Sequence, residues 1–352
     1  MDLYRIFKPV IYICRLFCLA PFAAVEDSDS TRYKFSIFWL LYSILGVCAS
    51  FTSQISVFWI PLTLSDAGLF NSFSHVTLTA TSLASVVTQI FCLKNGKDIL
   101  RILDHVSVLD SEHSGGPISY YRLYKVFSVH LIYCMISVVA PNILWLAALN
   151  TNSAYVFKFV YHTTVYFMCH IVLLLSDTQF IHFVLLLRYR FSVLNDTVMN
   201  FTVQSLHKKY LNHVIRAPAM DRSVNASISA VSSSITVLKS TLRKVCRHHD
   251  SLCDISELVN RTYSLQILLS VTVTCIQVLH TTFSFGTEMS TPNALTWFTS
   301  KQFLSMSALF RFFADSSKVV LLVAVCNRTS HEVSVLHLWC PHVCFLNTWP
   351  TE

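Results

Sequence analysis

Long stretches without charged side chains constrain this chain more than any other feature. Four stretches contain no Asp, Glu, Lys or Arg, at 35–65, 67–93, 126–157 and 262–287, and a fifth, 159–187, is broken only by Asp177. A helix needs about 20 apolar residues to cross a hydrocarbon core of about 30 Å, and only an internally bonded backbone is tolerated there. A weaker sixth stretch, at about 302–326, contains three charged residues. The sequence therefore predicts an all-α, polytopic membrane protein with six transmembrane helices, at about 35–60, 67–93, 126–150, 159–187, 262–286 and 302–326.

The basic residues indicate an orientation, because loops rich in Lys and Arg stay in the cytoplasm. The N-terminal segment, the loops 94–125 and 188–261 and the tail hold 22 of the 26 Lys and Arg residues, and the three remaining gaps hold two. The N-terminus and the loop 188–261 are therefore expected to be cytoplasmic. All five Asn-x-Ser/Thr triplets then lie in the cytoplasm and should carry no glycan; they begin at Asn195, Asn200, Asn225, Asn260 and Asn327.

The long loop shows helical periodicity at both ends. Apolar residues recur at steps of three to four residues from Leu242 to Leu258, so we expect the fifth helix to begin well before the membrane. The fourth helix continues past its span in the same way, and both helices should project into the cytoplasm. The Ser-rich middle, 223–234, is interpreted as a flexible linker. We predict one transmembrane domain, 1–352, with an atypical tail at 333–352.

Composition agrees with a membrane protein, since 53% of the residues are hydrophobic and 13% are charged. The net charge of +7 is expected of loops that face an anionic leaflet and does not call for nucleic acid. Many of the twelve cysteines lie in spans or in the cytoplasmic loop, which favours free thiols over disulfides. The first 34 residues either contain a cleaved signal or form an amphipathic or membrane-skimming helix that ends at Pro21. We favour the helix, because Arg15 interrupts the apolar stretch.

Charged residues inside spans are candidates for function, because each is costly to insert. Arg311, Asp315 and Lys318 share one face of the sixth helix and form either a polar stripe used in gating or an ion pair in a helix end that reaches the cytoplasm. We favour the ion pair. His170 and Asp177 share a face of the fourth helix, which predicts a buried hydrogen-bonded pair with either a structural role or a role as a proton relay. We favour the structural role.

Aromatic and polar side chains gather in the outer halves of the predicted spans. Ligand pockets combine aromatic walls with a few polar groups, which predicts a ligand-binding set of six residues: Trp145, Tyr161, His162, Tyr166, Gln277 and His280. The alternative is that they are interfacial aromatics, which collect at membrane boundaries.

The chain contains no recognisable enzyme signature. Phosphate-binding Gly-rich loops, nucleophile elbows and His-Glu-x-x-His are absent from the sequence. Two Cys and His clusters, at 246–253 and 337–344, lack the paired Cys-x-x-Cys spacing typical of zinc sites. We therefore predict no enzymatic activity, no metal and no cofactor.

Three short patterns resemble the insect gustatory receptor family. The first is N-terminal: Arg5, Phe7, Pro9-Val10, Arg15-Leu16 and Leu19-Ala20-Pro21-Phe22. The second opens the fifth span and is similar to a Leu-Asn, Tyr, Gln-Leu-Leu pattern: Leu258-Val259-Asn260, Tyr263 and Gln266-Ile267-Leu268-Leu269. The third ends the sixth span and resembles a Cys-Asn, Thr, Glu-Ala run: Cys326-Asn327, Thr329 and Glu332. Their order along nearly the whole chain strengthens the resemblance.

The resemblance implies a seven-helix receptor with a cytoplasmic N-terminus, which assembles as a tetrameric, ligand-gated cation channel in the plasma membrane of chemosensory neurons. The family's seventh helix lines the pore and ends in Thr-Tyr, about five apolar residues, and Gln-Phe. This sequence lacks that motif, because Thr262-Tyr263 opens the fifth span and no Gln-Phe follows it. We therefore expect the seventh helix to be missing here, which puts conduction by the chain alone in doubt.

These observations predict a gustatory receptor for small-molecule tastants, such as sugars or bitter compounds, coupled to cation permeability. Its expected partners are the tastant, the lipid bilayer and other gustatory receptors in a homo- or hetero-tetramer, with no nucleic acid. One alternative is a truncated, non-conducting subunit or modulator of such receptors. Another is a transporter fragment, although the paired broken helices typical of transporters are not evident.

Overall fold

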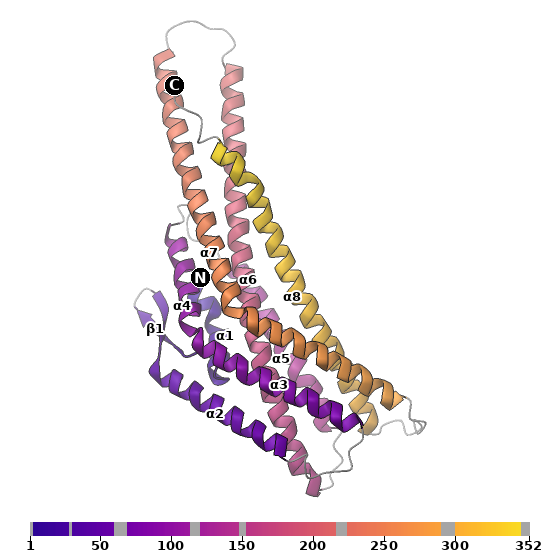
Figure 1. Ribbon diagram of the computed structural model, residues 1–352. Helices are drawn as coiled ribbons and strands as arrows, with labels where there is room; N and C mark the ends of the chain where they lie inside the picture. The colour runs from indigo at the N-terminus through magenta and orange to yellow at the C-terminus, as the bar shows by residue number, and fades with distance from the viewer. Residues whose placement is uncertain are drawn as a thin grey trace. The chain divides into compact units, whose positions relative to one another are not determined.

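Helices occupy most of the chain that the structure describes. The computed structural model describes residues 3–27, 30–59, 69–112, 120–147, 153–215, 224–289 and 300–345. Within these ranges lie eight helices: α1 (Leu3–Leu16), α2 (Ile37–Trp59), α3 (Leu69–Lys94), α4 (Gly96–Glu112), α5 (Tyr121–Ala147), α6 (Ser153–Ile215), α7 (Val224–Met289) and α8 (Ser300–Phe345). Strands β1 (Phe22–Asp27) and β2 (Ser30–Phe35) form one antiparallel hairpin between α1 and α2, as Figure 1 shows.

Each of the six predicted spans lies on one helix. Five described helices are long and apolar enough to cross a membrane: α2, α3, α5, α6 and α7. Helix α8 contains the predicted sixth span but is not among these five, because Arg311, Asp315 and Lys318 fall inside it. The all-helical, polytopic fold class is confirmed, and α6 and α7 are 63 and 66 residues long, so both extend far beyond a span.

Contacts within the chain divide it into two units. The first comprises Met1–Phe183 and Leu258–Ala324, and the second comprises Val184–Glu257 and Val325–Glu352. The first unit therefore contains α1 to α5, the hairpin and parts of α6, α7 and α8. In the second unit, Asn195 of α6 donates to Glu332 of α8, with 3.1 Å between Nδ2 and the carboxylate Oε2.

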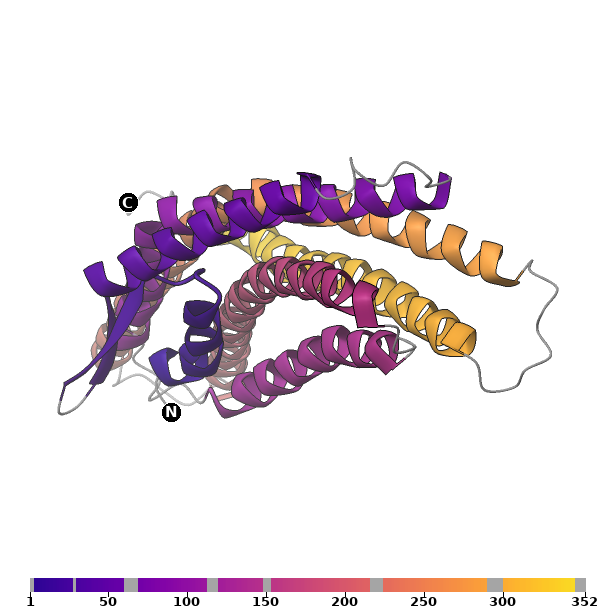
Figure 2. The ribbon, with the colours of Figure 1, turned by 90° about the horizontal axis from the view of Figure 1, so that it is seen from below.

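Helix α1 packs against protein through its apolar face. Phe7 is 2% exposed, and its ring centroid lies 5.4 Å from that of Phe127 on α5 and 5.0 Å from that of Phe183 on α6. Tyr33 of β2 donates to the Tyr4 carbonyl at 3.1 Å, which attaches the hairpin to the same helix. Figure 2 shows α1 beside the hairpin. The predicted amphipathic helix is thus present, but it ends at Leu16 rather than at Pro21. Its apolar face contacts protein, and its position at the membrane surface stays a prediction.

Polar side chains line the buried sides of the apolar helices. Helix α3 buries a row of hydroxyl and amide groups at helical spacing: Thr77, Thr81, Ser82, Ser85, Thr88 and Gln89. Helix α6 is the most enclosed, since 89% of its most apolar stretch is buried, against 11% in α2. Because lipid offers no hydrogen bonds, polar groups of this kind must find partners on neighbouring helices.

Two local expectations differ from the structure. The Ser-rich stretch predicted to be a flexible linker is helical from Val224 onward, because α7 begins there. Helix α4 was not anticipated, although Ile99, Ile102 and Val106 repeat at helical spacing and are buried.

Candidate functional site

The amide of Gln277 is the hub of a polar cluster in the first unit. Its Nε2 lies 3.2 Å from Thr81 Oγ1 on α3, 3.2 Å from Tyr166 Oη on α6 and 3.3 Å from His170 Nδ1 on α6. An amide NH₂ carries only two hydrogens, so it cannot satisfy three acceptors at once. At any moment one of the three acceptors therefore receives no hydrogen from the amide.

Helix α8 adds a cation to this cluster. The guanidinium carbon of Arg311 lies 5.2 Å from the centroid of the Tyr166 ring, close enough for a cation–π contact. Arg311 also donates to Asn142 Oδ1 on α5 at 3.1 Å. The preceding turn of α8 contacts α5 as well, because Ser307 donates to the Pro141 carbonyl at 2.8 Å. The cluster thus draws on α3, α5, α6, α7 and α8.

A buried ion pair lies beside this cluster. Lys318 Nζ on α8 lies 2.5 Å from Asp177 Oδ2 on α6, and both side chains are largely buried. Ser270 of α7 donates to the same carboxylate oxygen at 2.6 Å and accepts from Lys318 at 2.7 Å. Thr274 lies 3.4 Å from the ammonium. Three helices therefore share one pair of opposite charges, which keeps both charges compensated inside the bundle.

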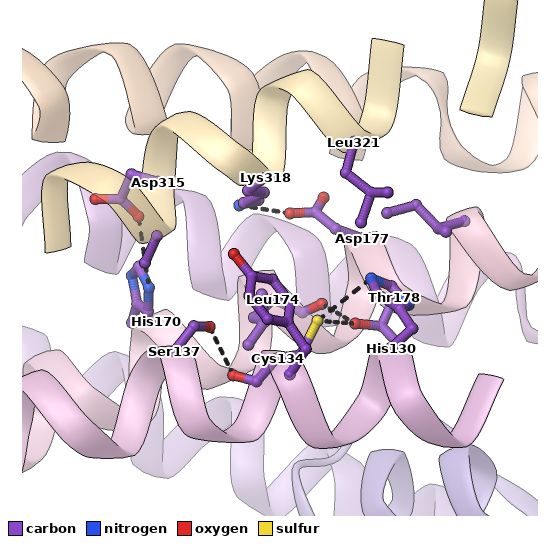
Figure 3. A pocket seen from close by; sticks show the side chains of 13 residues that line it. His130, Cys134, Ser137, His170, Leu174, Asp177, Thr178, Asp315, Lys318 and Leu321 are labelled. Carbon is purple, nitrogen blue, oxygen red and sulfur yellow. Dashed lines mark hydrogen bonds and ion pairs between the residues drawn. The ribbon is translucent and has the colours of Figure 1, made fainter. Parts of the chain in front are cut away.

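A small cavity adjoins the ion pair, as Figure 3 shows. Its walls come from α5, α6 and α8: His130, Tyr133, Cys134, Ser137, His170, Leu174, Asp177, Thr178, Ile181, Ala314, Asp315, Lys318 and Leu321. Its volume is about 20 Å³. About 10–15 Å³ on this measure is enough for one water, whereas pockets for drug-sized ligands enclose roughly 300–1,000 Å³. The cavity is thus of water size.

Two polar atoms near the cavity are enclosed without a hydrogen bond within the described part of the chain. One is Asp177 Oδ1, and the other is His182 Nδ1. The other ring nitrogen of His182 lies 3.2 Å from His130 Nδ1, and Phe127 stacks on the His182 ring with centroids 3.9 Å apart. Polar atoms enclosed in this way are usually satisfied by ordered water.

The structure unites some of the predicted residues and separates others. Tyr166, Gln277 and Arg311 meet in the polar cluster. His280 lies one turn beyond Gln277 on α7 and is partly buried. Trp145, Tyr161 and His162 belong to α5 and α6, but their side chains lie outside the described residues.

Two predicted pairings are wrong. His170 and Asp177 do not meet, because seven residues of helix separate them by about 10 Å along the axis. Asp177 pairs with Lys318, and His170 lies 3.9 Å from Asp315 on α8. The favoured interpretation of the α8 charges, a local ion pair in a helix end, is also wrong, because Lys318 is paired with another helix and Asp315 is only 5% exposed. The charges form a polar stripe that contacts other helices, and its use in gating stays a prediction.

Sequence reasoning missed several uncharged members of the network. Ser270 and Thr274 were not predicted, although they lie at spacings of four and three residues on the face of α7 that carries the predicted Gln277. Thr81 and Asn142 occupy apolar spans of their own. This periodicity of polar residues inside apolar runs is the signal that could have identified them.

Comparisons with known proteins come from three sources. The sequence model of a family described as 7tm chemosensory receptor matches residues 7–337. Among solved structures, the chain is similar to the insect olfactory receptor OR5 from Machilis hrabei in complex with eugenol, with 14% sequence identity and a TM-score of 0.58. That similarity covers 96% of this chain and 89% of the other. A search of curated proteins found no significant match.

Proposed function

Because the chain belongs to the 7tm chemosensory receptor family, we propose that it is a gustatory receptor, in which a small tastant shifts a conformational equilibrium that controls cation permeability. Membership of a receptor family confirms the prediction that the chain is not an enzyme. The five apolar helices make it a multi-pass membrane protein. The proposal that the chain is a taste receptor rather than an olfactory receptor rests on the three sequence patterns that resemble gustatory receptors. The plasma membrane of chemosensory neurons is its proposed location.

The polar cluster around Gln277 carries the proposal for the ligand site. A ligand hydroxyl can accept from the amide in place of one protein partner and donate its own hydrogen to that partner, so the exchange leaves no displaced group without a hydrogen bond. The aromatic ring of Tyr166 and the predicted neighbours Trp145, Tyr161, His162 and His280 would supply the apolar walls. A sugar or a bitter compound with several polar groups fits this chemistry.

Coupling to permeability follows from the number of helices that meet there. A ligand that replaces one protein partner of Gln277 changes the hydrogen bonds that connect α7 to α3 and α6. Arg311 of α8 contacts the Tyr166 ring, so the change also reaches α8. The ligand favours the open state only to the extent that it binds that state more tightly. Assembly with other gustatory receptors, as a tetramer, is part of the same proposal.

The test is electrophysiology of the full chain, expressed alone and with candidate gustatory partners, against a panel of sugars and bitter compounds. We expect a cation current that depends on the tastant, and Gln277→Leu should raise the half-maximal concentration roughly 5- to 30-fold, as the loss of one or two buried hydrogen bonds implies. Thr282→Val is the matched control, because Thr282 is exposed on the same helix and, among the described residues, bonds only to the carbonyl four residues before it.

The outcomes separate the parts of the proposal. An unchanged dose response in Gln277→Leu contradicts the site but leaves the receptor function intact. If the chain gives no current when expressed alone but alters the current of a co-expressed partner, the result supports the non-conducting modulator. No effect in either setting, with surface expression verified, contradicts the receptor function itself.

A further inference from the structure

Arg15 is a buried cation that has no anionic partner among the described residues. It lies in the last turn of α1 and is 4% exposed. Its Nε and Nη2 are enclosed and have no hydrogen-bond acceptor within the part of the chain that the structure describes. Burial of an uncompensated charge is costly, so such groups are normally paired. The environment of Arg15 therefore calls for an acceptor from outside the protein.

Aromatic rings surround the guanidinium. Its central carbon lies 5.0 Å from the ring centroid of Tyr12, 5.9 Å from that of Tyr33 and 5.5 Å from that of Trp39. The rings stabilise the cation through their faces, but they accept no conventional hydrogen bonds from its N–H groups. Burial raises the pKa of Tyr33 to about 12, so its phenol stays neutral and does not compensate the charge.

The position of this cage is that of a membrane interface. Trp39 lies in the first turn of α2, where the first apolar helix begins. The side chains of Leu16, Ile37 and Phe38 nearby are largely exposed, as expected of residues that face lipid. Trp and Tyr collect at the level of the lipid headgroups. The guanidinium is thus held at the depth at which phospholipid phosphates lie.

We propose that Arg15, with the rings of Tyr12, Tyr33 and Trp39, forms a binding site for the phosphate group of an anionic phospholipid. A guanidinium donates two parallel hydrogen bonds to a phosphate, a geometry that an ammonium does not offer. A zwitterionic headgroup brings its own cation, so a headgroup with a net negative charge compensates Arg15 better. Tyr12 is 49% exposed, and exposed side chains change rotamer within nanoseconds, so its ring can admit the headgroup.

Other basic residues of this region differ from Arg15. Arg101 is exposed and pairs with Asp98 at 3.0 Å, and Lys94 and Lys34 are exposed to solvent. General attraction of a basic surface to an anionic leaflet would involve all of them about equally. A site at Arg15 instead predicts a response that depends on this one side chain.

The test uses the full chain in nanodiscs of phosphatidylcholine, with or without phosphatidylserine. Native mass spectrometry counts bound phosphatidylserine, and a thermal scan gives the unfolding midpoint. We expect the wild-type chain to retain phosphatidylserine and to unfold at a higher temperature in its presence. Arg15→Gln should lower the affinity roughly 10- to 100-fold, as the loss of a charge-assisted pair of hydrogen bonds implies, and Arg15→Lys should lose less. Lys34→Gln is the matched control and should behave like the wild type, because Lys34 is exposed and lies next to Tyr33 on β2.

Several results would overturn the site. Equal loss of lipid in Arg15→Gln and Lys34→Gln would show general surface attraction, and equal retention would show that Arg15 is not involved. Stabilisation by soluble glycerophosphate in detergent, to the same extent as by the lipid, would assign the site to a free phosphate. If Arg15→Gln does not fold, density for a headgroup beside the guanidinium in a map of the wild-type chain in phosphatidylserine nanodiscs tests the same point, and an empty site there contradicts the proposal.

Discussion

Removing the ammonium of Lys318 should destabilise the bundle, because it leaves Asp177 as an unpaired charge. The two side chains lie 2.5 Å apart and are largely buried. Removal of one partner from a buried ion pair costs about 3–5 kcal/mol, and an uncompensated charge at the centre of a span costs about 2.5–3.5 kcal/mol on insertion scales. We therefore expect Lys318→Met to lower stability by about 3 kcal/mol. At roughly 2 °C per kcal/mol, the unfolding midpoint should fall by about 6 °C.

A double-mutant cycle isolates the pair. Asp177→Asn alone leaves Lys318 charged without its carboxylate, although Ser270 and Thr274 remain as acceptors for the ammonium. The combined variant removes both charges, so it should be more stable than the sum of the single effects predicts, by about 1–3 kcal/mol. The midpoint is measured by the thermal loss of the monodisperse peak in size-exclusion chromatography. Arg122→Met is the control, because Arg122 is exposed on α5 and should shift the midpoint by less than about 1 °C.

Asp177 and Lys318 are not coupled if the effects of the two single variants simply add. Additivity would mean that Asp177 and Lys318 are compensated independently, for example by water from the adjacent cavity. A Lys318→Met variant as stable as the wild type would also contradict the pairing, because the ammonium would then contribute no more than an exposed cation does.

Three further predictions concern other parts of the chain. Phe7→Ala should lower stability by about 3–5 kcal/mol in the same thermal assay, because Phe7 is buried between α5 and α6, whereas Leu16→Ala, at an exposed position, should change it by less than about 0.5 kcal/mol. Treatment with a glycosidase should leave the gel mobility of the expressed chain unchanged, and a shift that Asn195→Gln abolishes would contradict both the orientation and the bond from Asn195 to Glu332. Tyr263→Phe should cost about 1 kcal/mol, because it removes the buried hydroxyl that bonds to α6, and an unchanged midpoint would show that this bond adds nothing.

The spans were predictable because the membrane imposes a length. An apolar run must match the hydrocarbon thickness, so the expected range 35–60 differs from α2 by only a few residues at its start. The full lengths of α6 and α7 were less predictable, since helix outside the membrane needs no unbroken apolar run. Periodicity near Leu252 and Ile255 indicated the extension of α7 but did not show where it starts.

The hairpin and the partners of the buried charges were not predictable in the same way. β1 and β2 are short and include charged residues, and strands of that kind give little periodic signal. For the charges, the sequence shows which residues share a helix face, as His170 and Asp177 do. It does not show which helix faces them, and that arrangement pairs Asp177 with Lys318.

The pairing of Asp177 with Lys318 also bears on how α8 enters the membrane. Helices α2, α3, α5, α6 and α7 are apolar enough to cross on their own, but α8 is not, because it carries Arg311, Asp315 and Lys318. Each of these side chains has a polar or aromatic contact on α5, α6 or α7 within the described structure. The cost of inserting α8 is therefore offset only where those helices are already in place. We infer that α8 inserts as a partner of the bundle, so that substitutions at Asp177 on α6 should weaken the insertion of a helix more than 100 residues further along the chain.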